Sequence, residues 1–196
     1  MSAIIETKNA ISTGNRLFIK NIGKFLLPQT DLNICNDKQY ILIHYRRLVR
    51  LKPFISQRQM IQNTYIGYLK YKFKYEDFEK RRSLVLGKET SNHISWKTEL
   101  LQTYNFIMTA VSHVENQSIN ADRDIIMAKQ ILKNILTLEY FKIENNERIG
   151  HTDFYDYRVQ FKQLNGSGNQ QDDKGVDFGE FDKVVMYLNE TLGTRL

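Results

Sequence analysis

Proline and glycine are scarce in this sequence. Of its 196 residues, 2 are proline and 10 are glycine. Because these two residues most often interrupt regular elements, a chain so poor in them favours long helices over a turn-rich β fold. The length suits one compact core, or at most two small domains. We therefore predict an all-α protein.

Apolar residues recur at helical spacing in several stretches. We expect Ile41 on the buried side of its helix and nearly all the apolar residues from Ile125 to Leu138 to be buried. The spacing of a core-facing helix is shown by Leu100, Leu101, Tyr104, Ile107, Met108 and Val111. Ser56, with Gln59 three residues later, predicts a capping box, and Gly193 predicts a helix C-cap. The run NGSGNQQDDKG (165–175) has no apolar residue and predicts a mobile loop. We predict a single-domain bundle of five or six helices: an N-terminal segment over 1–38, flexible or targeting, precedes a helical domain over 39–196. The expected helices cover residues 39–52, 56–82, 97–111, 120–138 and 181–192, and residues 15–27 are a candidate for a sixth.

The N-terminal segment is basic. Lys8, Arg16, Lys20 and Lys24 face the single acid Glu6 in the first 27 residues. If residues 15–27 are helical, three of these cations recur every fourth residue along one stripe. This pattern is typical of a mitochondrial transit peptide, and an ordinary surface helix or a flexible arm would show it too. Mitochondrial localisation is our expectation.

The positive charge is concentrated in one region. The net charge is +6, but residues 40–90 hold twelve Lys and Arg against four acids, which is +8, and the remainder is −2. Two runs, HYRRLVRLKPF (44–54) and YIGYLKYKFKYEDFEKRR (65–82), combine cations with aromatic residues. The candidate partner-binding residues are Tyr45, Arg46, Arg47, Arg50, Lys70, Lys72, Phe73 and Lys74.

Three interpretations of this basic region stay open. Cations bind phosphates and aromatic rings stack on bases, which favours nucleic acid. An acidic protein partner fits the charge equally well. Adjacent residues of a helix point in different directions, so the aromatic residues can instead form the core while the lysines are a solvated face.

No pattern of catalytic or metal-binding residues occurs, so we expect no cofactor, no metal site and no enzymatic activity. Cys35 has no CxxC partner, and placing Gly175 in a calcium loop puts the wrong residues at the ligand positions. Phosphate-binding, hydrolase and zinc-protease motifs are missing. No stretch approaches the roughly 18 uninterrupted apolar residues of a membrane-spanning helix. The four histidines, expected to be structural or surface residues, are His44, His93, His113 and His151.

Four segments resemble the Increased recombination centers protein 19 family of budding yeasts. They are YRRLVRLKPFIS (45–56), TYIGYLKYKF (64–73), AKQILKNILTLEY (128–140) and YLNETLGTRL (187–196). The resemblance implies a non-enzymatic role in maintaining mitochondrial DNA and in sporulation, within a pathway that contributes to genome integrity. It supplies no catalytic residues.

A second resemblance is to the LYR-motif proteins, small three-helix mitochondrial assembly factors that dock an acyl carrier protein. Tyr45-Arg46, Arg50 and the segment 68–73 carry it, with His44 standing where those proteins have Leu. It implies that Arg46 and Arg50 face an acidic helix of the carrier and that Phe73 is the downstream aromatic. Guanidinium groups pair well with carboxylates and phosphate.

Overall fold

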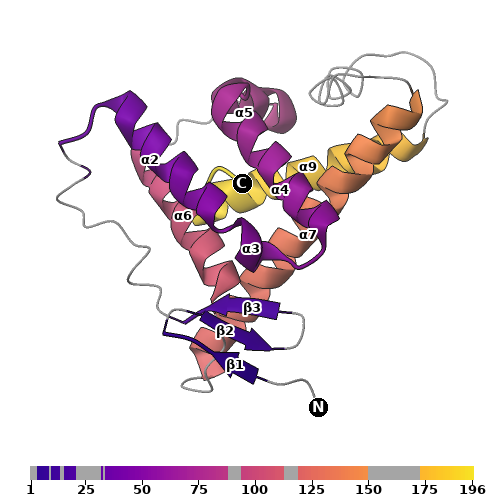
Figure 1. The fold of residues 1–196 in the computed structure, drawn as a ribbon. Coiled ribbons are helices and arrows are strands. Elements are labelled where there is room, and N and C mark those ends of the chain that lie inside the picture. Colours follow the sequence, from indigo (N-terminus) through magenta and orange to yellow (C-terminus); the bar gives the residue numbers. More distant parts are fainter. Residues whose placement is uncertain are drawn as a thin grey trace. The chain divides into compact units, whose positions relative to one another are not determined.

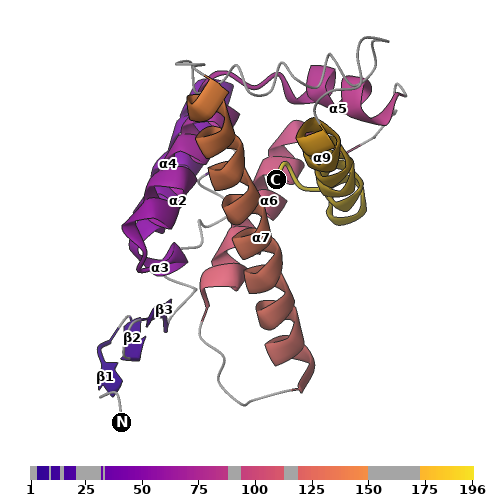
Figure 2. The ribbon, with the colours of Figure 1, turned by 90° about the vertical axis from the view of Figure 1, so that its right-hand side faces the viewer.

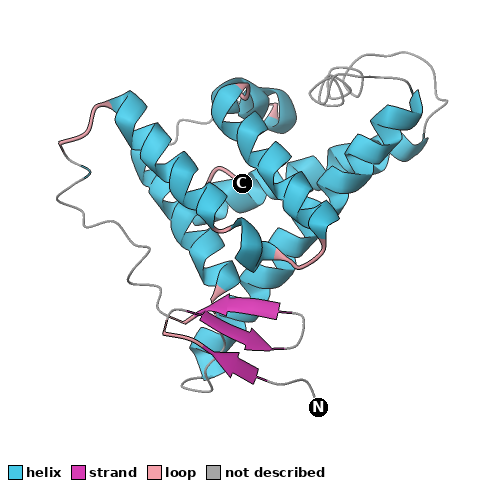
Figure 3. Ribbon diagram, in the orientation of Figure 1, coloured by secondary structure: helices cyan, strands magenta, loops and turns pink. Residues whose placement is uncertain are grey.

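Seven helices and one three-stranded sheet make up the described part of the chain. The computed structural model describes residues 4–8, 10–13, 16–20, 32, 34–87, 94–112, 119–149 and 173–196. The prediction of a mainly helical protein is confirmed (Figures 1 and 3). The elements are β1 (Ile4–Glu6), β2 (Ala10–Thr13), β3 (Arg16–Ile19), α2 (Asp37–Arg50), α3 (Lys52–Ile55), α4 (Gln59–Lys74), α5 (Phe78–Leu86), α6 (Trp96–Val111), α7 (Ile119–Ile149) and α9 (Asp173–Leu192).

The chain forms two compact units that are interleaved in sequence. The first unit comprises Met1–Phe73 and Tyr104–Thr137, and the second comprises Lys74–Thr103 and Leu138–Leu196. The sheet, α2, α3 and nearly all of α4 belong to the first unit, and α5 and α9 belong to the second. Helices α6 and α7 contribute residues to both.

The N-terminal sheet corrects the helix predicted over 15–27. Residues 16–19 form β3, which pairs antiparallel with β2, and β2 pairs antiparallel with β1. A recurrence of four residues fits a strand as well as a helix, because four is a multiple of the strand period of two. Ile19 is 1% exposed and bridges to Ser112. Residues 21–27 lie outside the described residues.

Helix α2 begins earlier than predicted because Asn36 caps it. The Asn36 side chain accepts from the Gln39 backbone N–H at 2.9 Å, and the Gln39 side chain accepts from the Asn36 N–H at 3.1 Å. This is a full capping box. The buried residues of the helix are Tyr40, His44 and Leu48, whereas Ile41, expected in the core, is 37% exposed.

The single helix predicted over 56–82 is two helices, α4 and α5. Asp77 starts α5 by accepting a hydrogen bond from the Lys80 N–H at 3.2 Å. The capping box predicted at Ser56 is wrong. The Ser56 hydroxyl accepts from the Arg58 N–H, and the Gln59 side chain donates to the Asn63 side chain, so the two residues do not bond reciprocally. In Figure 2, α2 and α4 run beside each other and α3 lies where they meet.

Buried aromatic and aliphatic side chains fill the first unit. The face predicted for α6 is confirmed in its main positions, since Tyr104, Ile107 and Met108 are each 1% exposed. The prediction that nearly all apolar residues of α7 are buried is only partly right, because Ile126 is 46% exposed. Other buried residues of this unit are Ile11, Leu48, Leu51, Tyr65, Tyr68, Leu69, Val111, Ala128, Leu132, Ile135 and Leu136.

The second unit packs α9 against α5 through a small apolar cluster of Phe78, Val85 and Met186. Helix α9 begins at Asp173, earlier than predicted, so residues 173–175 of the expected loop are helical and 165–172 lie outside the described residues. The C-cap prediction is confirmed: Gly193 has φ 62°, and Thr194 N–H donates to the Asn189 carbonyl at 3.0 Å. A Cβ on Gly193 would also collide with the Gln102 side chain.

Candidate functional site

Two contacts hold α2 and α4 side by side in the first unit. The Tyr65 hydroxyl, on α4, donates to the Leu48 carbonyl of α2 at 2.9 Å. The rings of Tyr45 and Phe73 lie 5.4 Å apart between centroids. Arg46 lies between the two contact residues of α2, and Lys70 lies between those of α4. These two cations are therefore at about the same level of the helix pair.

The exposed cations of this helix pair include Arg46, Arg50 and Lys70. Among the residues that the structure describes, none of them forms an ion pair. Arg50 follows Arg46 by one helical turn, a rise of about 6 Å. We call these three residues, with the half-buried Tyr45 and Phe73, the α2–α4 face. It is the candidate site for an anionic partner.

The other predicted site residues are used within the fold or lie at the margin of this face. Arg47 is half-buried and hydrogen-bonds the Tyr104 side chain. Burial raises the pKa of Tyr104, and the Arg47 guanidinium partly opposes that rise. The Lys72 ammonium lies 5.4 Å from the Tyr68 ring. Lys74 is exposed, and its ammonium lies 5.0 Å from the neighbouring Tyr75 ring. It is the first residue of the second unit.

The basic segment predicted over 40–90 divides at the boundary between the units. Lys80, Arg81 and Arg82 belong to the second unit. Arg81 pairs with Glu76 at 2.6 Å, and Arg82, which is 3% exposed, pairs with Glu190 at 2.5 Å. These two arginines are therefore neutralised within the fold.

The two units differ in charge as a result. The first unit contains 15 Lys and Arg against 6 Asp and Glu, a net +9. The second contains 13 against 16, a net −3. The positive character of the whole chain thus belongs to the first unit, which carries the α2–α4 face.

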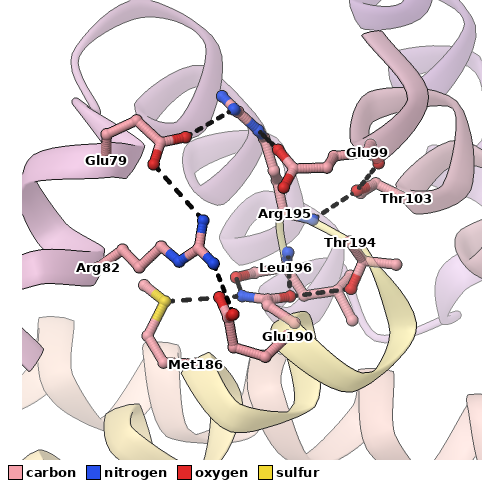
Figure 4. A network of polar contacts seen from close by, with 10 residues as sticks. Glu79, Arg82, Glu99, Thr103, Met186, Glu190, Thr194, Arg195 and Leu196 are labelled. Atoms are coloured by element: carbon pink, nitrogen blue, oxygen red, sulfur yellow. Dashed lines mark hydrogen bonds and ion pairs between the residues drawn. The ribbon is translucent and has the colours of Figure 1, made fainter. Parts of the chain in front are cut away.

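Sequence reasoning missed a buried ionic network in the second unit. Figure 4 shows Arg195 between two carboxylates, with its Nε donating to Glu99 at 2.6 Å and its Nη2 to Glu79 at 2.9 Å. Elsewhere in this unit, Lys142 donates to both carboxylate oxygens of Asp182 at 2.7 and 2.8 Å. No local pattern signals this network, because its partners lie 40 to 116 residues apart in the sequence. These contacts tie the C-terminal Arg195 to α5 and α6 and join α7 to α9, and each of the three acids has a cation beside it.

His44 is fully buried beneath the α2–α4 face. Its Nδ1 lies 2.9 Å from the Tyr40 carbonyl, and its ring meets the Tyr104 ring edge-on at 5.8 Å. Its Nε2 has no hydrogen-bond partner among the described residues. Burial lowers the pKa of His44, and the Arg47 charge lowers it further, against the opposing effect of the Tyr40 carbonyl. The prediction of a structural histidine is confirmed here; His93, His113 and His151 lie outside the described residues.

The described ranges hold neither a metal-binding cluster nor a membrane-spanning helix. Histidine, cysteine and acidic side chains nowhere gather there in a group of three that could hold a metal ion. Every helix in those ranges is too short or too polar to cross a membrane.

The fold and the face define a small helical protein with one strongly basic unit. The chain belongs to the Increased recombination centres protein 19 family, whose model matches residues 5–196. Family members of that name include one from Vanderwaltozyma polyspora, 36% identical over 98% of this chain and 96% of its own length. The member from Zygosaccharomyces rouxii is 35% identical over 98% of each chain. The member from Kluyveromyces lactis is 32% identical over 98% of this chain and 99% of its own length. No solved structure matches the chain.

Proposed function

We propose that this chain is a non-catalytic factor in genome maintenance, acting in mitochondria to maintain mitochondrial DNA and also needed for sporulation. Family membership over residues 5–196 supports the genome-maintenance role, because the relatives are named for increased recombination centres. The finer role in mitochondrial DNA and sporulation is supported by the resemblance of the segments 45–56, 64–73, 128–140 and 187–196.

The observation that carries the molecular part of this proposal is the exposure of Arg46, Arg50 and Lys70 without ion-pair partners in the described structure. Cations that stabilise a fold are normally paired when they are buried, as Arg82 and Lys142 are here. Exposed, uncompensated cations on two packed helices create a positive potential that attracts an anionic partner. The α2–α4 face is therefore proposed to act by binding.

The test is a comparison of charge-reversal variants in cells that lack the chromosomal gene. Loss of the gene should lower the ratio of mitochondrial to nuclear DNA and the number of spores, and the unmodified chain should restore both. Arg46→Glu/Lys70→Glu should restore neither.

The matched control is Lys80→Glu/Lys183→Glu, which changes the net charge equally at exposed positions of the second unit. It should restore both readouts. An undiminished mitochondrial DNA ratio in the deleted cells would contradict the proposal.

A second candidate function is an LYR-like adaptor that binds acyl carrier protein during mitochondrial assembly. The contact of Tyr45 with Phe73 favours it, because it places the predicted downstream aromatic beside the Tyr45-Arg46 pair. His44 is 0% exposed, so the position at which the LYR motif has Leu is a core position here.

Affinity purification from isolated mitochondria tests the adaptor function. Acyl carrier protein should co-purify with the unmodified chain and with Lys183→Ala, and Arg46→Ala should abolish the co-purification. Equal recovery of the carrier with Arg46→Ala, or no recovery with the unmodified chain, would exclude this function.

A further inference from the structure

We propose, on the footing of the proposed role in genome maintenance, that the α2–α4 face binds the phosphate backbone of duplex nucleic acid without reading its sequence. The first argument is the spread of charge. The first unit carries +9, and its unpaired, exposed cations are not confined to one spot. In addition to the three on the face, they include Lys38, Arg58 and Lys133, none of which forms an ion pair with a described residue.

Exposed cations that are spread over the first unit match an extended polyanion better than a compact acidic site. A DNA duplex carries one negative charge per about 1.7 Å of its axis, so an array of cations meets phosphates wherever it lies along the duplex. An acidic protein would instead bind best around a buried aromatic or apolar anchor. The aromatic residues of the face are half-buried against each other and are not available as such an anchor.

The rigidity of the face favours contact with phosphates. Arg46 and Lys70 are at one level of a helix pair that is fixed by the Tyr65–Leu48 hydrogen bond, and Arg50 follows one turn along α2. Cations on packed helices lose less conformational freedom on binding than cations on a loop. The arginine guanidinium also presents a planar fork of donors that suits phosphate oxygens.

The position of the aromatic rings decides between duplex and single strand. Binding of single strands relies on ring faces on which bases stack. Here Tyr45 and Phe73 pack on each other, Tyr65 and Tyr68 are buried, and the ring of the exposed Tyr75 has an ammonium near it. Binding through phosphates alone carries no direct sequence information. We therefore expect sequence-independent binding that prefers a duplex.

The experiment measures fluorescence anisotropy with the purified full chain and labelled probes. The probes are two duplexes of about 20 base pairs with unrelated sequences, one of their single strands, and a poly-glutamate peptide of similar charge, between about 50 and about 200 mM salt. The two duplexes should bind equally and more tightly than the single strand or the peptide. The logarithm of the affinity should fall linearly with the logarithm of the salt concentration.

Charge reversal then locates the binding surface. Arg46→Glu/Lys70→Glu should reduce the steepness of the salt dependence by about 2, because two phosphate contacts are lost. Lys80→Glu/Lys183→Glu should leave it unchanged. Circular dichroism and thermal unfolding establish that both variants are folded; if the first is not, Arg46→Gln/Lys70→Gln replaces it, with the same expected change in slope.

Several results would overturn the inference: no saturable duplex binding at the lowest salt, tighter binding of the single strand or of poly-glutamate, or an equal loss in the control variant. These results are separate from the test in cells. Failed duplex binding together with lost mitochondrial DNA refutes only this inference. Intact mitochondrial DNA in deleted cells, together with duplex binding in vitro, refutes only the proposed function.

Discussion

At the scale of single residues, Tyr65 shows how the support of the α2–α4 face depends on one buried hydroxyl. Its side chain is fully buried, and its hydroxyl donates to the Leu48 carbonyl at 2.9 Å. Burial raises the pKa of the Tyr65 phenol well above its usual range, so the hydroxyl keeps its proton and remains a donor. The hydrogen bond joins α4 to α2 at Leu48, which lies between Arg46 and Arg50 in the sequence.

Removing this hydroxyl should weaken the first unit without changing its shape. We expect Tyr65→Phe to lower the free energy of unfolding by about 1 kcal/mol, the usual net value of a buried hydrogen bond. Urea-induced unfolding measures the change. The control is Tyr45→Phe, which keeps the ring contact with Phe73. Equal destabilisation by the two substitutions would contradict this role of Tyr65.

His44 gives the first unit a dependence on pH. Its pKa is lowered in the folded chain, mainly by burial, whereas in the unfolded chain it is near its ordinary value. The unfolded chain therefore takes up the proton first as the pH falls. His44 stabilises the fold fully above about pH 6.5, and this contribution declines as the pH falls toward the lowered pKa.

We expect the free energy of unfolding to decrease between about pH 7 and about pH 5.5, with a slope of at most about 1.4 kcal/mol per pH unit from His44. The slope of His44→Phe should be shallower, because the new ring fits beside Tyr104 and does not titrate. Urea unfolding at a series of pH values tests this. The other three histidines are common to both proteins, so parallel curves would show that His44 does not contribute.

At the scale of elements, α9 is organised by polar contacts on its buried face. Asp182 and Asn189 are 1% and 2% exposed, whereas Val184, on the opposite side, is 62% exposed. The Asn189 side chain accepts from the Leu196 backbone N–H at 2.7 Å and donates to the Leu196 carbonyl at 2.9 Å. The C-terminal residues are thereby fixed against the helix they follow.

The Lys142–Asp182 pair should be costly to break from one side. Both side chains are at most 4% exposed, so Lys142→Met leaves a buried carboxylate without its main partner. We expect a loss of about 3–5 kcal/mol in the free energy of unfolding. The exposed pair of Lys183 with Glu180 is the control, and Lys183→Met should cost less than about 1 kcal/mol.

The double variant Lys142→Met/Asp182→Leu completes the thermodynamic cycle. It should be more stable than Lys142→Met alone, because the buried Asp182 carboxylate that lost its main partner is no longer present. Urea unfolding of the unmodified chain, of Lys142→Met, of Asp182→Leu and of the double variant gives the interaction free energy. A double variant as unstable as the sum of the single variants would mean that the pair does not act as a unit.

At the scale of the whole molecule, the N-terminal residues are part of the first unit. Ile11 and Ile19 are 8% and 1% exposed, and the Lys129 ammonium lies 4.4 Å from the Phe18 ring. The sheet also contacts α3 through β3. Removal of this segment would expose part of the core of the first unit to water.

We therefore expect the chain to keep residues 4–20 in the cell. Intact mass measurement of the purified native protein would detect their removal. In vitro, deletion of residues 1–20 should make the first unit sensitive to limited proteolysis. Ile4→Ala/Ile5→Ala, at positions 68% and 61% exposed, should leave it resistant. A native protein that starts beyond residue 20 would contradict the expectation.

Much of the fold could be predicted from local patterns. The scarcity of proline and glycine indicated helices, and the spacing of Tyr104, Ile107 and Met108 identified the buried face of α6. The strand β3 was missed because a four-residue recurrence fits both helix and strand. The buried face of α9 was missed because Asp182 and Asn189 count as exposed residues in any reading of hydrophobicity. Their burial depends on partners from other helices.

The sequence by itself determined that this is a mainly helical chain with an excess of cations around residues 40–90. Only the tertiary structure decided which of those cations can bind a partner. Arg81 and Arg82 meet Asp182 and Glu190, which lie 101 and 108 residues further along the chain. No such carboxylate reaches Arg46, Arg50 or Lys70 in the described structure. The charge of a side chain is a property of its type, but its neutralisation depends on residues brought close by folding.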